Sequence, residues 1–173
     1  FGHLNEYLNS FVGGGIMFLW INQQGTSPET AALLSNQNFR QALNYGFDRS
    51  ATVNAVNPGY KAYNRLVDSN FAGPDGGTFV DEYPVETVPL SGDVDKAKEY
   101  LAAAMEELGY SDVSQLPQLE LITWDTSEQK LLLETIIDQW KQNLGLENIQ
   151  LTQYVIGTAI GSFYDLSYDL FSI

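Results

Sequence analysis

The most constraining feature of this sequence is a predicted strand, helix and second strand that follow one another between residues 116 and 155. "LPQLELITW" predicts a strand, because Leu119, Leu121 and Thr123 alternate onto one face. "TSEQ" (126–129) then matches a capping box. In that motif Thr126 and Gln129 each accept a hydrogen bond from the other's backbone N–H at the start of a helix.

The helix that follows has one apolar face and a defined end. Gly145 is its natural C-terminal residue, and "IQLTQYV" predicts the next strand. Because the links are short, we expect the two strands to be parallel, joined by a right-handed crossover. The apolar face comprises Leu133, Ile136, Ile137, Trp140 and Leu144.

The rest of the chain supplies further elements around this unit. "GGGIMFLWINQ" (13–23) predicts a buried strand entered through glycines, and "YDLFSI" predicts a last strand. Residues 60–92 are irregular, which is typical of a functional or wrapping loop. Asp93 is expected to cap a helix that ends at Gly109, with an inward face of Ala97, Tyr100, Leu101, Ala104, Met105 and Leu108. We therefore expect an α/β fold, a mixed sheet flanked by helices, in a single domain over residues 1–173.

"NFRQALNYGFDRS" (38–50) mixes an apolar stripe with charged residues, so it could be a site or scaffold. It predicts a helix, followed by a second helix that starts at Asp48 or Ser50 and turns Ala51, Val53 and Val56 inward. Arg40 and Asp48 lie two turns apart, so we expect Asp48 to cap the second helix and not to pair with Arg40. Gly46 suggests the close approach of another backbone. We interpret the stretch as scaffold, with an inward face of Phe39, Ala42, Leu43, Gly46 and Phe47.

Charge and composition exclude several classes of function. The formal net charge is −14, which disfavours nucleic acids and anionic membrane surfaces. The chain has no cysteine and one histidine, His3 near its start, so disulfides, thiolate sites, histidine zinc sites and Ser-His-Asp triads are not expected. No apolar run reaches the length of a membrane span. We expect no metal and no cofactor.

Two patterns could be mistaken for chemistry. "GGG" at 13–15 precedes a strand, whereas a phosphate-binding loop follows one, so a hinge or a close backbone approach is the better interpretation. Asp165 and Asp169 could form an acid–base pair, but nothing in the sequence brings them together. No G-x-S-x-G nucleophile motif occurs. We therefore expect a protein that is not an enzyme.

A binding site is suggested where the first strand of the βαβ unit ends. Trp124 lies at the carboxyl end of that strand, the edge at which open α/β sheets bind ligands. Asp125, Thr126 and Ser127 follow, beside free N–H groups of the helix start. The alternative is a helix cap with a tryptophan covering the sheet edge. Lys130 lies in the first helical turn, where the helix dipole disfavours a cation, which suggests a role outside the helix.

Several motifs in order resemble the family 5 extracellular solute-binding proteins, the peptide-binding components of ABC importers. "FLWINQQ" comes first, and the later stretch "LELITWDTSEQ" and a final "YDL" complete the series. The pattern N…R-Q-A-[LI]-x-x-[AG]-x-D-R is met by Asn22, Arg40, Gln41, Ala42, Leu43, Gly46, Asp48 and Arg49. The pattern D-x-x-K-A-K-x-x-L-x-x-A is met by Asp93, Lys96, Ala97, Lys98, Leu101 and Ala104. The pattern W-K-x-N-L-G is met by Trp140, Lys141, Asn143, Leu144 and Gly145.

The resemblance implies one lobe of a type II periplasmic-binding-protein-like fold, in which two lobes close on a ligand. We expect a truncated C-terminal lobe, cut at both ends, from an extracytoplasmic protein held at the periplasm or the outer face of the cell membrane by a lipid anchor. The implied partners are a peptide and the ABC permease, with no nucleic acid, and the protein is expected to be a monomer. Alternatives are a binder of another solute, such as a nickel chelate or a sugar, and a peptide-pheromone sensor.

By position, six residues are expected to face the ligand. Lys130 is the leading candidate, because a long lysine could reach a peptide carboxylate. Relatives often place an aromatic contact just after the strand at 149–155, where this chain has Tyr154 and Ile156 but no tryptophan. The expected ligand-binding residues are Gly14, Gly15, Met17, Trp124, Lys130 and Tyr154.

Overall fold

A computed structural model describes residues 16–57 and 59–172 of the chain. These residues form two compact units. The larger unit contains Met17–Asn64 and the chain from Thr87 onward, and the smaller one contains Ile16 and Arg65–Glu86. The predicted sheet and most of the helices belong to the larger unit.

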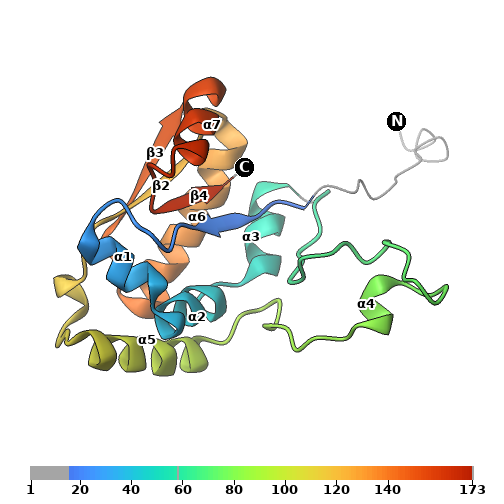
Figure 1. Cartoon of the computed structure of the whole chain (residues 1–173), viewed down its shortest axis with the longest axis horizontal. Helices are drawn as coiled ribbons and strands as arrows, with labels where there is room; N and C mark the ends of the chain where they lie inside the picture. The colour runs from blue at the N-terminus through green and yellow to red at the C-terminus, as the bar shows by residue number, and fades with distance from the viewer. Residues whose placement is uncertain (1–15, 58, 173) are drawn as a thin grey trace. The chain divides into compact units, whose positions relative to one another are not determined.

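The larger unit is built on a four-stranded mixed sheet in the order β1-β4-β2-β3 (Figure 1). The strands are β1 (Leu19–Ile21), β2 (Leu119–Trp124), β3 (Ile149–Tyr154) and β4 (Leu170–Ser172). β2 is parallel to both β3 and β4, whereas β1 is antiparallel to β4. The predicted parallel pair and the predicted last strand are therefore confirmed.

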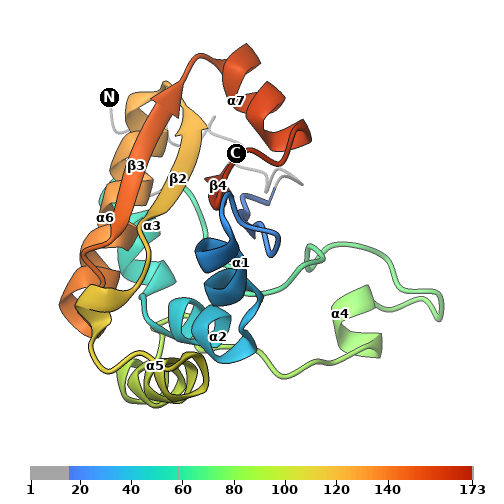
Figure 2. The same cartoon turned by 60° about the vertical axis from the view of Figure 1, so that its left-hand side comes forward.

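Helices cover both faces of this sheet. The larger unit contains α1 (Pro28–Ser35), α2 (Gln37–Tyr45), α3 (Arg49–Val56), α5 (Val94–Leu108), α6 (Ser127–Leu144) and α7 (Ile156–Tyr164), with a 3₁₀ turn at Val113–Gln115. Figure 2 shows α6 and α7 on opposite sides of the sheet. The expected α/β architecture, a mixed sheet flanked by helices, is confirmed.

The alternation of side chains in the strands separates two hydrophobic clusters. Leu119, Leu121 and Leu170 face the main core, to which α1, α2, α5 and α6 contribute. Ile122 and Phe171 point the opposite way, into a smaller cluster with Ala159 of α7 and Tyr168. The second cluster stabilises α7, because apolar residues of this short helix pack on the face of the sheet opposite the main core.

The start of α6 differs from the predicted capping box. Thr126 caps the helix as expected, since its hydroxyl accepts a hydrogen bond from the backbone N–H of Gln129 at 3.2 Å. The reciprocal bond is replaced, because the backbone N–H of Thr126 donates to the carbonyl of Trp124 at 2.9 Å. The helix ends as predicted at Gly145, whose φ of 73° is the left-handed conformation that glycine adopts without strain.

The stretch at 38–50 is scaffold, as interpreted, but two details of the prediction were wrong. Asp48 caps α3, accepting from the N–H of Ala51 at 2.8 Å. Ala51 is exposed, however, and Thr52 is the buried residue of that helix. Gly46 ends α2. The segment that approaches it is not the backbone of another element, as expected, but two side chains of α6. A Cβ on Gly46 would lie 2.8 Å from Leu144 and 3.2 Å from Trp140.

The two arginines of this stretch also serve the scaffold. Arg40 donates to the carbonyl of Leu34 at 2.8 Å. Arg49 binds the carbonyl and the side-chain oxygen of Asn44 and lies over the ring of Phe47 at 4.4 Å. Burial lowers the pKa of the Arg49 guanidinium below its usual range. Both cations therefore tie helices together.

Three further expectations need correction or fall outside the described residues. The buried strand predicted over 13–23 is a short β1 with Trp20 exposed, because β1 pairs only with β4 and its outer edge is free among the described strands. Gly13, Gly14 and Gly15 lie outside the described residues, as does His3. The sequence analysis also missed α1 and α7. Within the described residues no helix is long and apolar enough to cross a membrane.

The smaller unit is organised by one carboxylate. Glu82, at the end of the short helix α4 (Phe79–Glu82), accepts from the backbone N–H of Gly77 at 2.8 Å and of Asp75 at 3.1 Å. An isolated bridge joins Ala72 and Thr78 around the "GPDGG" turn. The irregular stretch predicted at 60–92 thus contains a turn that one side chain holds closed.

Candidate functional site

The candidate site lies where β2 and β3 end together. Trp124 and Tyr154 are in register as the last residues of the two parallel strands. The next backbone N–H, that of Asp125, donates to the carbonyl of Tyr154 at 2.8 Å, and α6 begins directly after this turn. Strand pairing therefore brings the predicted residues Trp124 and Tyr154 side by side at the carboxyl edge of the sheet.

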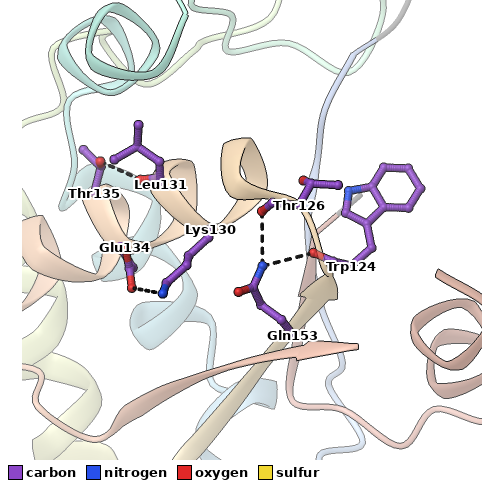
Figure 3. A network of polar contacts seen from close by, with 7 residues as sticks. All are labelled: Trp124, Thr126, Lys130, Leu131, Glu134, Thr135 and Gln153. Atoms are coloured by element: carbon purple, nitrogen blue, oxygen red, sulfur yellow. Dashed lines mark hydrogen bonds and ion pairs between the residues drawn. The ribbon is translucent and has the colours of Figure 1, made fainter. Parts of the chain in front are cut away.

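Gln153 fixes the turn between β2 and α6. Its side-chain amide donates to the carbonyl of Thr126 at 3.1 Å and to that of Trp124 at 3.4 Å (Figure 3). A glutamine on β3 thus satisfies two carbonyls of the loop that follows β2. The sequence analysis missed this residue, because alternation in a strand assigns a side chain to a face without revealing a bond to a neighbouring loop.

Lys130 and Trp124 are not brought together. The ammonium group of Lys130 lies 3.8 Å from the carboxylate of Glu134, one turn along α6, and both side chains are about half exposed. Figure 3 shows the indole of Trp124 on the other side of the turn, directed away from Lys130. Such an exposed ion pair is weak, so the lysine is available for another anion.

Trp124 and Tyr154 belong to the smaller hydrophobic cluster, on the face of the sheet that α7 covers. Both are partly buried against Ile122, Phe171 and their neighbours. The cluster continues through Phe163, whose ring stacks on Tyr168 at 5.7 Å and meets the edge of Trp20 at 5.8 Å. Trp20 itself is 44% exposed. The sheet edge therefore offers aromatic surface, which combines both interpretations of Trp124, as cover for the sheet and as a contact surface.

Met17 and Tyr60 approach the start of α6 from other parts of the chain. The sulfur of Met17 lies 3.8 Å from the side-chain nitrogen of Gln129, and Met17 is 40% exposed. The hydroxyl of Tyr60 is hydrogen-bonded to the carboxylate of Glu128, which raises the pKa of this tyrosine. Tyr60 had no signal in the sequence. The predicted contacts Gly14 and Gly15 lie outside the described residues.

Asp169, half of the suspected acid–base pair, is a buried structural acceptor. One of its oxygens accepts from the backbone N–H and the hydroxyl of Thr26, both at 2.9 Å, and the other accepts from the N–H of Glu120 at 3.0 Å. Asp165 is exposed at the end of α7. The first carboxylate links three segments and the second faces solvent, so the acid–base interpretation finds no support in their surroundings.

This arrangement offers several kinds of group that can contact a ligand. Among the described residues, the edge combines aromatic side chains, a helix start with polar groups, the exposed ammonium group of Lys130 and the exposed thioether of Met17. In the described part of the chain no group of three or more histidine, aspartate or glutamate residues could hold a metal ion.

Comparison with known proteins shows similarity to solute-binding proteins. The family model described as "Bacterial extracellular solute-binding proteins, family 5 Middle" matches residues 3–159. The oligopeptide-binding protein OppA of Bacillus subtilis is 31% identical over 114 residues, which cover 66% of this chain and 20% of that protein. The chain thus spans about a fifth of the length of this relative.

Solved structures share the fold. Listeria monocytogenes OppA bound to peptide superposes with a TM-score of 0.76 at 22% identity, over 91% of this chain and 30% of that one. The pheromone receptor PrgZ superposes with a TM-score of 0.68 at 25% identity, over 90% of this chain and 29% of that one. The expected likeness to periplasmic-binding-protein-type structures is confirmed.

Proposed function

Because the chain belongs to family 5 of the bacterial extracellular solute-binding proteins, we propose that it is one lobe of a two-lobed protein that captures peptides for an ABC importer. The single observation that carries the proposal is the shared end of β2 and β3, where Trp124, Tyr154 and the start of α6 form one edge. In open α/β sheets, ligands bind outside the carboxyl ends of the strands.

The edge of the sheet that carries the candidate site would also be the place where a second lobe is connected. Leu19 of β1 pairs with Ser172 of β4, and Ser172 is in register with Thr123 near the end of β2. The start of β1 and the end of β4 therefore lie beside the candidate site. Connections to a second lobe would run alongside a bound ligand there, so that binding and lobe closure would be coupled. Residues 1–173 would then be a single truncated C-terminal lobe.

The ligand would be held by main-chain hydrogen bonds and tolerant side-chain pockets. Lys130 would give up its exposed pairing with Glu134 to bind a peptide carboxylate, at little cost because such surface pairs contribute about 1 kcal/mol or less. Met17, Trp124 and Tyr154 would supply apolar contacts. Gly14 and Gly15 would allow a peptide backbone to approach closely.

The remaining features of the proposal follow from this role. Binding and closure would be the whole activity, so no catalytic step is proposed. The complete protein would act outside the cytoplasm as a lipid-anchored monomer and would deliver its peptide to the permease subunits of the importer. The net charge of −14 is consistent with a soluble surface exposed to the medium.

A pheromone-receptor role is the second candidate, favoured by the likeness to PrgZ at 25% identity. In that case the bound peptide would be a signal and not a nutrient. Permease and ATPase genes beside this one would favour import, and a regulatory gene in their place would favour signalling.

Calorimetric titration of the complete protein with a library of short peptides tests the proposal. We expect binding at about micromolar affinity, or about −8 kcal/mol. Sugars and nickel chelates are the matched alternatives in the same titration. Binding of one of these, with no peptide bound, would contradict the proposal and identify another solute.

A further inference from the structure

Gln129 carries a buried oxygen that the described part of the fold leaves without a partner. The residue is only 5% exposed, at the third position of α6. Its side-chain nitrogen faces the sulfur of Met17 at 3.8 Å, a weak contact. Its oxygen, Oε1, has no hydrogen-bond partner among the described residues. Buried polar atoms are nearly always paired, so this one needs an explanation.

The local helix does not need this amide. The capping box would have used Oε1 to accept from the N–H of Thr126, but that N–H donates to Trp124 instead. An unpaired buried acceptor costs its desolvation, whereas an apolar side chain of similar shape would carry no such cost. Stability alone would therefore favour leucine or methionine at position 129, and the glutamine calls for a role outside folding.

The position of Gln129 indicates what that role is. It lies in the first turn of the 18-residue helix α6, directly after the sheet edge that ends in Trp124 and Tyr154. The neighbouring backbone N–H groups of Ser127 and Glu128 donate no hydrogen bond within the described structure. Met17 covers the amide with a flexible, partly exposed side chain that can move aside.

The chemistry of one buried neutral acceptor selects its ligand. An ammonium group would bring a charge and three donors to a place that offers one described acceptor, leaving donors unpaired. A carboxylate would bring no donor at all. A main-chain amide of a peptide has one N–H, which matches the single acceptor, and one carbonyl, which suits the free N–H groups of the helix start.

We propose that the side-chain oxygen of Gln129 accepts a hydrogen bond from one main-chain N–H of a bound peptide once the side chain of Met17 moves aside. The inference rests on the proposed peptide-binding function and adds a residue that fixes the register of the peptide. Methylating that one peptide nitrogen removes the donor.

The test uses the complete protein and a short peptide that binds it in the library titration. The peptide is compared with analogues that each carry a single N-methyl group, one for every peptide bond. We expect the unchanged protein to lose about threefold to tenfold in affinity at one position through loss of this hydrogen bond. In Gln129→Leu that difference should vanish, while the exposed, matched control Gln150→Leu should retain it.

A second readout separates recognition from folding. Without peptide, Gln129→Leu and the more flexible Gln129→Met should unfold at the same or a higher temperature than the unchanged protein, because both remove the unpaired oxygen. Lower stability of both variants would show that the amide is structural and would overturn the inference. An identical N-methyl profile in Gln129→Leu would overturn it too, while leaving peptide binding intact. Absence of binding by any peptide would instead remove the proposed function on which the inference rests.

Discussion

Leu19 and Ser172 are paired across antiparallel strands, and the hydroxyl of Thr123 donates to the carbonyl of Ser172 at 2.9 Å. These contacts place the first residue of β1 and the last residue of β4 beside the end of β2. The edge of the sheet that carries the candidate site is thus also the edge at which the outer strand pair begins and ends. A displacement of this pair would reach Trp124 through a chain of direct contacts.

Asp169 should be essential for stability. In Asp169→Asn an amide nitrogen replaces one of two oxygens that together accept from Thr26 and Glu120. We expect a loss of about 2 to 3 kcal/mol in the free energy of unfolding, since the lost bonds are charge-assisted. Urea denaturation measures this change. Asp165→Asn is the exposed control and should change stability by less than about 0.5 kcal/mol; equal effects of the two changes would contradict the structural assignment.

Gly46 should not tolerate a side chain. In Gly46→Ala the new Cβ would lie 2.8 Å from both the carbonyl of Ala42 and the side chain of Leu144. Overpacking of this kind costs about 1 to 3 kcal/mol. Gly161→Ala, within α7 and with nothing inside 4 Å of the new Cβ, should instead stabilise by about 0.5 to 1 kcal/mol. Thermal unfolding compares the two, and a stable Gly46→Ala would show that α2 and α6 can separate without cost.

Lys130 should matter for binding and hardly at all for folding. Its ion pair with Glu134 is exposed, so Lys130→Gln should leave the free energy of unfolding within about 0.5 kcal/mol. We expect this variant to bind peptides with a free carboxyl terminus about tenfold more weakly, or about 1.4 kcal/mol. Carboxyl-terminally amidated peptides should show no such difference. Lys141→Gln, which removes the exposed pairing with Glu147, is the control that should bind normally; a similar loss in both variants would indicate a general charge effect.

Tyr168 should make stability fall at alkaline pH. Burial against Phe163 and Phe171 raises the pKa of this tyrosine above its ordinary value of about 10. As pH rises past about 10, the unfolded chain loses the phenolic proton first, so the contribution of Tyr168 is present below that pH and is lost above it. Urea denaturation at neutral and alkaline pH should show a smaller loss for Tyr168→Phe than for the unchanged protein. Tyr164→Phe, at a 78% exposed residue, should follow the unchanged protein.

The sequence predicted those elements correctly that depend on a regular spacing of apolar residues or on a capping side chain close by in the sequence. Alternation of Leu119, Leu121 and Thr123 was enough to place β2, and the caps at Asp93 and Asp48 were read correctly because a capping side chain acts within three residues. It missed α7, whose two glycines and β-branched residues give weak helix propensity and which forms through packing on Phe171 and Ile122. Ser27 followed by Pro28 was a usable start signal for α1 that was overlooked.

The candidate site, too, could be predicted from the sequence only in part. The edge itself was predictable, because parallel strands of known sequence end together at Trp124 and Tyr154. Gln153, Tyr60 and the unpaired oxygen of Gln129 were not, since each depends on contacts between segments distant in sequence. The capping box shows why. The motif predicts two hydrogen bonds, but the carbonyl of Trp124 accepts from the N–H of Thr126 in place of the Gln129 side chain, so only one of the two forms.

The strand order β1-β4-β2-β3 has a consequence for the route by which this chain folds. β4, which comes last in the sequence among the described strands, lies between β1, which comes first among them, and the βαβ unit. Until Leu170–Ser172 leave the ribosome, β1 has no described partner and its backbone groups remain open to other chains. The βαβ unit can collapse early through local contacts, whereas β1 joins the sheet only after Leu170–Ser172 have been synthesised. A chaperone that shields β1 before Leu170–Ser172 emerge would therefore improve the yield more than one that acts after β4 has paired with β1.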